Sequence, residues 1–419
     1  MHGLVYLFAG ASVIEKGYLK TGKAEGKPFF VYTPGKRHVM VTSNQHIKEL
    51  NEAPSSTLSL HAVAKDFLQP KHTMRGFEWK SQRGIEGTGF VRAIRTLLTS
   101  HLPVVKPALM DVISGILERE LNKQKVVADH RTLPLFATVK QIVNKSTSLV
   151  FFGDSLSQNQ EFLNIALQFS EDVFLGAEIL RMMPGSVGSF IARLMTRGHR
   201  SSTILYDYLY LEVERRLEQR QRGDIAESPN DGIQWLLDTS PKTARWDADR
   251  LVGEIMGVWY GSIHTLAIAS TYAVIDLYSH RDYIEPLRKE VQGQTLDQLD
   301  NLPLLDAFLK ESARVSAFES TGIRREALTP FTFSDGLEVS VGEWICVPHR
   351  SMMRDSKHFD LPLEFNASRF FSNTTVSASP FKPSRLVDAS EQWLVWGSGR
   401  ILWYAKTHSE RLISLDMPN

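Results

Sequence analysis

An acidic and a basic residue at helical spacing are the first residues in this sequence that could act together. Glu311 and Arg314 stand three apart in an amphipathic stretch, so their side chains can meet on one helix face. Arg369 follows in an Arg-Phe step after an irregular stretch. A carboxylate held between two guanidinium groups would form a buried network that fixes geometry more than it adds stability. Alone, the first pair is equally compatible with an exposed ion pair worth roughly 0.2–1 kcal/mol.

Residues 255–275 (IMGVWYGSIHTLAIASTYAVI) form the most hydrophobic long stretch of the chain. Their length and composition pass a crude filter for a membrane-spanning helix. They also contain Gly257, Gly261, His264, Ser270 and Thr271, which make the stretch polar for a helix facing lipid. We therefore expect a long helix buried on all sides in a large protein core.

Several other kinds of chemistry lack their residues. The glycines at 84, 87 and 89 have no strand before them and no P-loop lysine, and the sequence has no H-E-x-x-H motif and no G-x-S-x-G elbow. Cys346 is the only cysteine, which excludes an internal disulfide framework and fits a reducing compartment. A net charge of +1 indicates no partner of the nucleic-acid class.

Hydrophobic periodicity predicts a mostly helical chain with a small strand-rich part. Residues 28–52 predict two strands around Pro34-Gly35 and then a helix opened by Ser43 or Asn44. Period-two alternation around Asp335-Gly336 predicts a hairpin within residues 331–347. Spacings of three and four predict helices at 97–124, 158–178, 203–222 and 304–315.

Four motifs in order give the chain a family resemblance. They are GSIHT (261–265), ESAR (311–314), FNASRF (365–370) and LVWGSGR (394–400). Together they resemble the cytochrome P-450 family of heme-thiolate monooxygenases, in its fungal microsomal type related to ent-kaurene oxidases. The resemblance covers roughly residues 17–400. It implies the mainly helical triangular-prism fold, with a small β part built from residues 28–43 and 329–349.

The resemblance assigns roles to particular residues. Thr265 would help to deliver protons to bound dioxygen, beside His264 at a position where many members have an acid, and Gly261 and Ser262 would leave room. A helix threonine bonded to its own backbone is the alternative for Thr265. Glu311, Arg314 and Arg369 would form the structural triad behind the heme. The candidates for binding the cofactor are Arg95, Arg324, Arg325 and Arg400, with Arg324 or Arg325 facing a heme propionate.

The sequence departs from the family where the heme ligand is expected. The family's loop reads F-x-x-G-x-R-x-C-x-G, and its cysteine position falls on Trp403. Tryptophan cannot ligate iron, because its indole nitrogen only donates a hydrogen bond. Cys346 lies on a predicted strand before this loop, where a small buried hydrophobe is the expected role. His408 lies in the tail, where nothing positions it.

The departure sets the expected domain organisation. Residues 1–16 are expected to be a remnant N-terminal helix rather than a membrane anchor, and 17–400 an incomplete P-450 domain that lacks its proximal helix. Residues 401–419 are expected to be a divergent tail, from a retained intron, a frameshift or a truncated gene model.

By resemblance, the full-length function is a heme-dependent monooxygenase that oxidises an apolar small molecule, such as a fungal terpenoid. It would use dioxygen and electrons from NADPH through cytochrome P-450 reductase, on the cytosolic face of the endoplasmic reticulum membrane. Apolar residues at 149–152 and 174–190 suit a lipophilic pocket wall, although core packing explains them equally well. The alternative is a non-catalytic family member that cannot hold heme as a thiolate complex.

Overall fold

Long helices make up most of the chain, which confirms the predicted fold class. A computed structural model describes residues 2–22, 26–74, 93–124, 131–183, 185–223, 229–240, 246–295, 298, 302–370, 385–388 and 393–397. The α-helices are α1 (His2–Gly17), α3 (Asn44–Glu52), α4 (Leu60–Leu68), α5 (Pro70–Thr73), α7 (Thr99–Lys123), α8 (Leu135–Phe152), α9 (Asp154–Ser157), α10 (Gln160–Met182), α11 (Gly185–Met195), α12 (Arg200–Arg222), α13 (Gly232–Thr239), α14 (Ala248–Ser279), α15 (Ile284–Val291), α16 (Pro303–Val315) and α17 (His349–Met353). Short π- or 3₁₀-helical turns cover Tyr18–Gly22, Ala93–Leu98, Arg281–Tyr283 and Ala367–Phe370.

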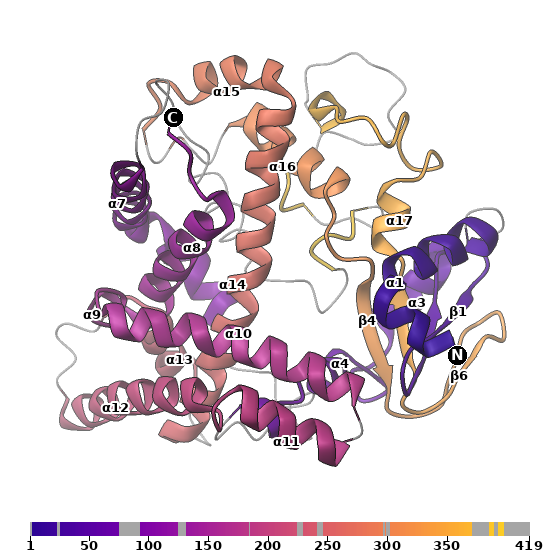
Figure 1. Cartoon of the computed structure of the whole chain (residues 1–419), viewed down its shortest axis with the longest axis horizontal. Helices are drawn as coiled ribbons and strands as arrows, with labels where there is room; N and C mark the ends of the chain where they lie inside the picture. The colour runs from indigo at the N-terminus through magenta and orange to yellow at the C-terminus, as the bar shows by residue number, and fades with distance from the viewer. Residues whose placement is uncertain are drawn as a thin grey trace.

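The strand-rich part lies at one side of the molecule, next to α1 and α3 (Figure 1). Its strands are β1 (Phe29–Tyr32), β2 (Arg37–Met40), β3 (Leu58–Ser59), β4 (Gly322–Ala327), β5 (Phe331–Thr332), β6 (Glu338–Val339) and β7 (Trp344–Val347). Five of them form one sheet in the order β1-β2-β7-β4-β3, and β5 pairs with β6. In that sheet β7 is central, parallel to β2 and antiparallel to β4.

Most of the expected elements are present at the expected places. Gly35 takes a positive φ of +95° between β1 and β2, and Ser43 caps α3 by accepting a hydrogen bond from the backbone of His46. The sequence did not predict β3 or β4. In β4 the side chains alternate between intermediate and buried positions, but Arg325 occupies a buried one. An arginine at an inward position removes the apolar alternation by which a strand is recognised.

α14 is the long helix expected at 255–275, and it stands in the middle of the helical part (Figure 1). It is long and apolar enough to cross a membrane, yet 72% of its most hydrophobic window is buried inside the protein. Its first turn is capped by Asp247, whose side chain accepts a hydrogen bond from the backbone of Arg250. The buried-helix interpretation is therefore the one that the structure supports.

The helical core is built around α8 and α14. Phe151 and Phe152 of α8 are each 1% exposed, and the Phe152 ring lies 5.7 Å from that of Trp259 on α14. This favours core packing over a pocket wall for residues 149–152. By contrast, Phe174 and Phe190 are 49% and 70% exposed, so residues 174–190 carry side chains that the core does not cover.

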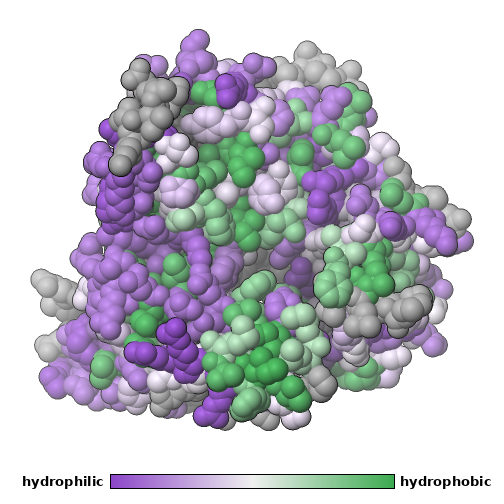
Figure 2. All heavy atoms as spheres, in the orientation of Figure 1, coloured by the Kyte–Doolittle hydropathy of each residue, from purple (hydrophilic) through white to green (hydrophobic). Residues whose placement is uncertain are grey.

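Hydrophobic atoms gather in two places on the face seen in Figure 2, along α14 and lower down over α11. Tyr272, Ile275 and Tyr278 are exposed on α14, and Phe190 and Leu194 on α11. Between these patches and the sheet the surface is hollowed (Figure 2). One face of α14 therefore borders an open hollow.

Candidate functional site

Glu311 lies at the centre of a buried ion-pair network on α16. The Nε and Nη2 atoms of Arg314 donate to its two carboxylate oxygens, each at 2.7 Å. The Arg369 Nε donates to the Glu311 Oε1 at 3.2 Å, and the Asn366 backbone N–H donates to the same oxygen at 2.8 Å. The side chains of Glu311 and Arg314 are fully buried. The structure thus brings together the three charged residues of the predicted triad.

Arg314 also ties the following segment to α16. Its Nη1 donates to the carbonyl oxygens of Met353 and Pro362 at 2.8 and 2.7 Å, and its Nη2 donates to that of Glu364 at 3.2 Å. Sequence reasoning missed these partners because backbone carbonyls carry no side-chain signal. A bidentate carboxylate and three carbonyls use the whole guanidinium fork, which makes this a rigid support.

The open face of α14 carries Gly257, Gly261, His264, Thr265 and Ile268. Thr265 is exposed, and the other four are only partly buried, whereas the residues around them on the helix are mostly buried. Their spacing of three and four places them along one side of the helix. A glycine pair on this side leaves the backbone open to close approach. This face could therefore receive a flat, largely apolar group.

Thr265 does not behave as an ordinary helix threonine. On the same helix, the hydroxyls of Ser262 and Thr271 donate to the carbonyls four residues earlier, at 3.0 and 2.7 Å. Within the described part of the chain, no such bond is found for Thr265. Ser262 is only 7% exposed, so the structure separates it from the open face on which the resemblance placed it. The exposed hydroxyl of Thr265 is free to meet a bound molecule.

His264 lies beside Thr265 in an aromatic setting. Its ring centroid is 6.1 Å from that of Phe174 on α10 and 6.0 Å from that of Tyr260. Burial lowers the pKa of His264, and this outweighs a hydrogen bond with the backbone of Ser170, which acts in the opposite direction. The imidazole is therefore a neutral group next to Thr265, whereas a carboxylate there would carry a fixed charge.

The two arginines of β4 differ in what neutralises them. Arg324 is partly exposed, donates to the Thr321 carbonyl at 2.8 Å and pairs with Glu319 at 3.2 Å. Arg325 is 4% exposed and donates to the Arg324 carbonyl, and no described carboxylate forms an ion pair with it. Burial lowers its pKa to about 10. A buried cation without a counter-ion is costly, so Arg325 is the one that fits an external carboxylate.

Three predicted residues lie where their side chains are not described. Arg95 falls in the turn Ala93–Leu98, which packs against α13 and α7. Arg400 and Trp403 lie outside the described residues.

Cys346 lies in the middle of the central strand β7. It is 1% exposed, faces Met40 across the parallel pairing with β2, and belongs to the hydrophobic cluster under the sheet. Burial raises the pKa of its thiol to about 12. An iron-binding thiolate needs the opposite shift. Its place in the sheet agrees with a small buried hydrophobe.

These residues fit a heme in part. Arg325 fits a propionate, and the open face of α14 fits the face of a porphyrin. The axial thiolate does not fit, because the chain's only sulfhydryl is protonated and enclosed in the sheet. Across the residues that the structure covers, no group of three or more His, Cys, Asp or Glu side chains could hold a metal ion. The described site therefore consists of the Glu311 ion-pair network and the open face of α14, and no described residue can serve as the thiolate ligand.

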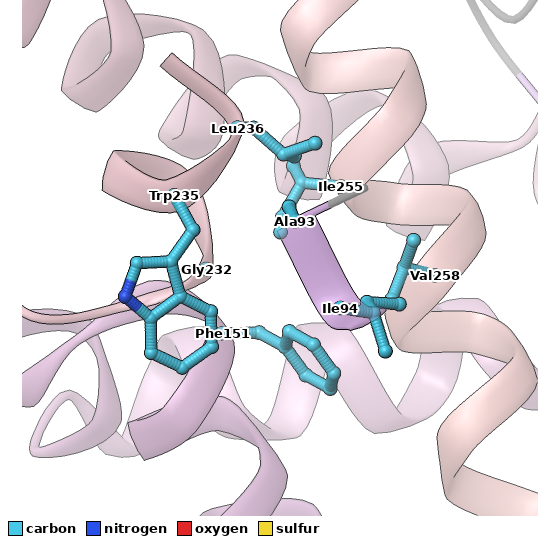
Figure 3. Close-up of a pocket in the computed structure, with 8 residues that line it drawn as sticks. All are labelled: Ala93, Ile94, Phe151, Gly232, Trp235, Leu236, Ile255 and Val258. Atoms are coloured by element: carbon cyan, nitrogen blue, oxygen red, sulfur yellow. The ribbon is translucent and has the colours of Figure 1, made fainter. Parts of the chain in front are cut away.

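A small apolar cavity lies deeper, between α8, α13 and α14 (Figure 3). It has room for about one water molecule. Its lining residues are Ala93, Ile94, Phe151, Gly232, Trp235, Leu236, Ile255 and Val258. Its lining is apolar and presents no group of polar atoms to a ligand, so it is a gap in the packing rather than a binding site.

Comparisons of the sequence and of the fold with known proteins found the following matches. The family model for cytochrome P450 matches residues 13–387. The chain is 27% identical over 411 residues to cytochrome P450 monooxygenase 151 of Postia placenta, covering 95% of this chain and 79% of that protein. It is 23% identical to cytochrome P450 monooxygenase penQ of Penicillium crustosum, covering 95% and 78%. The fold matches retinoic acid-bound cyanobacterial CYP120A1 with a TM-score of 0.72 at 16% identity, covering 96% and 84%.

Proposed function

This chain belongs to the cytochrome P450 family of oxidoreductases, and we propose that its fold oxidises an apolar small molecule on the open face of α14. The substrate class is a fungal secondary metabolite such as a terpenoid. The observation that carries this is Thr265, the exposed residue amid the buried middle of α14. The family implies a heme, which supplies the activation of dioxygen when it is bound by a thiolate.

The chain's own residues would then have distinct tasks. Arg325 would hold a heme carboxylate, and Gly261 would leave space above the ring. The Thr265 hydroxyl would hold and pass a proton on the open face, with neutral His264 as its neighbour. Glu311, Arg314 and Arg369 would keep α16 and the segment after it rigid. The open face of α14 carries no charged side chain, and an apolar substrate would meet no unpaired charge there.

Electrons would come from NADPH through cytochrome P-450 reductase, since the family generally uses a redox partner. We further propose that the protein works at the cytosolic face of the endoplasmic reticulum membrane. α11 supports this, because Val187, Phe190 and Leu194 point outward beside the exposed Arg193 and Arg197. Exposed apolar side chains next to arginines favour contact with a lipid surface.

The competing function is a non-catalytic relative that does not form a thiolate complex. Cys346 is the observation that favours it, because the only thiol of the chain is part of the sheet. To become a ligand, Cys346 would have to leave its pairing with β2 and expose the hydrophobic cluster beneath. The two functions therefore differ in one observable property, the axial ligand.

A carbon-monoxide difference spectrum of the reduced, heme-reconstituted full chain separates the two functions. The proposed monooxygenase requires a thiolate-type, red-shifted Soret band, and Cys346→Ala must abolish it because no other cysteine exists. An unshifted band, or one that Cys346→Ala leaves unchanged, overturns catalysis by this polypeptide and supports the non-catalytic function. Arg325→Met is the companion variant, with heme affinity expected to fall while the band position stays the same.

A further inference from the structure

α16 carries a second set of polar contacts, partly buried, which begins at Asp306 and ends at Lys310, just before Glu311. These contacts reach the C-terminal segment, defined here as residues 385–388 and 393–397. The Lys310 Nζ donates to the Arg385 carbonyl at 3.0 Å. The Asp306 carboxylate accepts from the backbone N–H of Leu386, at 3.1 and 3.0 Å from its two oxygens. Asp306 and Lys310 are four residues apart, so both project from one side of α16.

The Lys310 ammonium is enclosed by aromatic rings. Its Nζ lies 4.9 Å from the ring centroid of Phe370 and 4.8 Å from that of Trp393. The residue is 1% exposed. A cation at this distance from two ring faces is attracted by both, and more strongly when water is excluded. Lys310 thus joins the end of the 367–370 turn to the C-terminal segment.

The backbone of Leu386 is the meeting point of these contacts. Its N–H is held by Asp306, and its carbonyl accepts from the indole Nε1 of Trp393 at 3.1 Å and of Trp396 at 2.7 Å. Leu386 and Trp393 are themselves 2% exposed. The segment is therefore fixed at both of its described ends before the chain continues past Gly397.

We propose that Asp306 and Lys310 form a clamp that positions the C-terminal segment, with the Lys310 ammonium held against the rings of Phe370 and Trp393. This segment leads into the loop where the resemblance places the family's heme ligand, and only that functional meaning rests on the proposed function. The clamp is separate from the Glu311 network, which holds residues 353–369. α16 thus supports two successive parts of the chain from neighbouring turns.

Burial and two carboxylates act on the protonation of Lys310. Burial lowers its pKa to about 8, while the carboxylates of Asp306 on α16 and Asp388 on the segment act in the opposite direction. The ammonium is therefore the main form at neutral pH and is lost as the pH rises through about 8. Deprotonation removes both ring contacts and the charge on the bond to Arg385.

Fluorine NMR of the full chain labelled with 5-fluorotryptophan tests the clamp. The Trp393 resonance, identified by its loss in Trp393→Phe, should titrate with a midpoint near the Lys310 pKa of about 8. Lys310→Met should abolish this titration, and Lys289→Met, which removes an exposed lysine of α15, should leave it intact. A Trp393 resonance that is flat through this range in the unchanged protein overturns the proposal, even if Lys310→Met does not fold.

Amide hydrogen exchange gives the second readout. In Lys310→Met the amides of residues 385–388 should exchange at least roughly tenfold faster, because one charge-assisted bond and two cation–π contacts are lost. Lys310→Arg should restore most of the protection, and the amides of residues 311–315 should not change. Equal acceleration in both places would mean general loosening and would overturn a local clamp. Neither measurement uses heme, so failure of the proposed function would leave these results unaffected.

Discussion

α16 and the middle of the adjacent helix α14 differ in how far the rest of the chain encloses their polar residues. On α16 the charged side chains of Glu311 and Arg314 are fully buried, and each has several hydrogen-bond partners within the chain. On α14 the middle of the helix is hydrophobic, yet Thr265 is exposed on it, and so are Tyr272 and Ile275 further along. The charged side chains of α16 thus find their partners within the chain. The open face of α14 is not fully covered by other described residues and can contact a bound molecule.

The difference predicts where substitutions should lower the stability of the fold and where they should not. Buried ion networks tolerate little change, because removing one partner leaves an uncompensated charge. An open helix face tolerates change in stability terms, because its side chains have few contacts to lose. Substitutions should therefore be costly to stability on α16 and nearly neutral on the open face of α14.

The largest expected effect belongs to Arg314→Met. This change leaves the buried Glu311 carboxylate with Arg369 and one backbone N–H. It also removes the Arg314 donor from three backbone carbonyls, of which that of Glu364 keeps only a 3.5 Å bond from Arg369. We expect the free energy of unfolding to fall by about 3–5 kcal/mol, measured by urea denaturation. Arg288→Met breaks the exposed pair with Glu285 and is the matched control, with an expected loss of about 0–1 kcal/mol. Equal losses in the two variants would contradict the contrast.

A pH effect of intermediate size should come from His349, at the start of α17. His349 is 6% exposed, and burial lowers its pKa to about 4, with Arg324 acting in the same direction. Because the unfolded chain binds this proton more tightly, stability should be lost as the pH falls from about 6.5 towards 4. The loss should be about 3 kcal/mol, at 1.36 kcal/mol per pKa unit.

Acid titration of the unfolding free energy checks this expectation. His349→Phe should reduce proton uptake on unfolding near pH 5 by about one proton. The slope that remains should include His38, whose pKa burial also lowers to about 4. An unchanged slope in His349→Phe would show that the folded protein accommodates the charged imidazole.

The sequence predicted the α16 network and the α14 stretch for different reasons. Glu311 and Arg314 could be paired because helical spacing is local, and the aromatic-flanked Arg369 was added by the family motif. The spacing could not reveal Lys310 or Asp306, because their partners are backbone atoms 75 and 80 residues away. The spacing also could not show that Ser262 is buried and Thr265 exposed. Which side of a helix faces the core is decided by tertiary packing, and this helix is hydrophobic on most sides.

The strand-rich part shows the same limit. The pairing of β1 with β2 followed from a local turn at Gly35, whereas β4 became recognisable only through its pairing with β7. That pairing depends on residues that are remote in sequence. In addition, Arg325 places a charged residue at a buried position, so β4 lacks the alternation of apolar and polar residues that indicates a strand. The burial of Cys346 could be expected from its residue type. Its place at the centre of the sheet could not, because that depends on the pairing of β7 with both β2 and β4.

The smallest expected effect is the sharpest test of the contrast. Thr265→Val replaces an exposed hydroxyl that is not engaged in the four-residue backbone bond seen for its neighbours, so the free energy of unfolding should change by less than about 0.5 kcal/mol. Thr271→Val on the same helix removes the bond to the Ala267 carbonyl and should cost about 1 kcal/mol. The matched pair holds helix propensity constant, so denaturation curves compare the two hydroxyls directly. If Thr265→Val costs as much as Thr271→Val, then Thr265 serves the helix, and the open face loses the residue on which its chemistry depends.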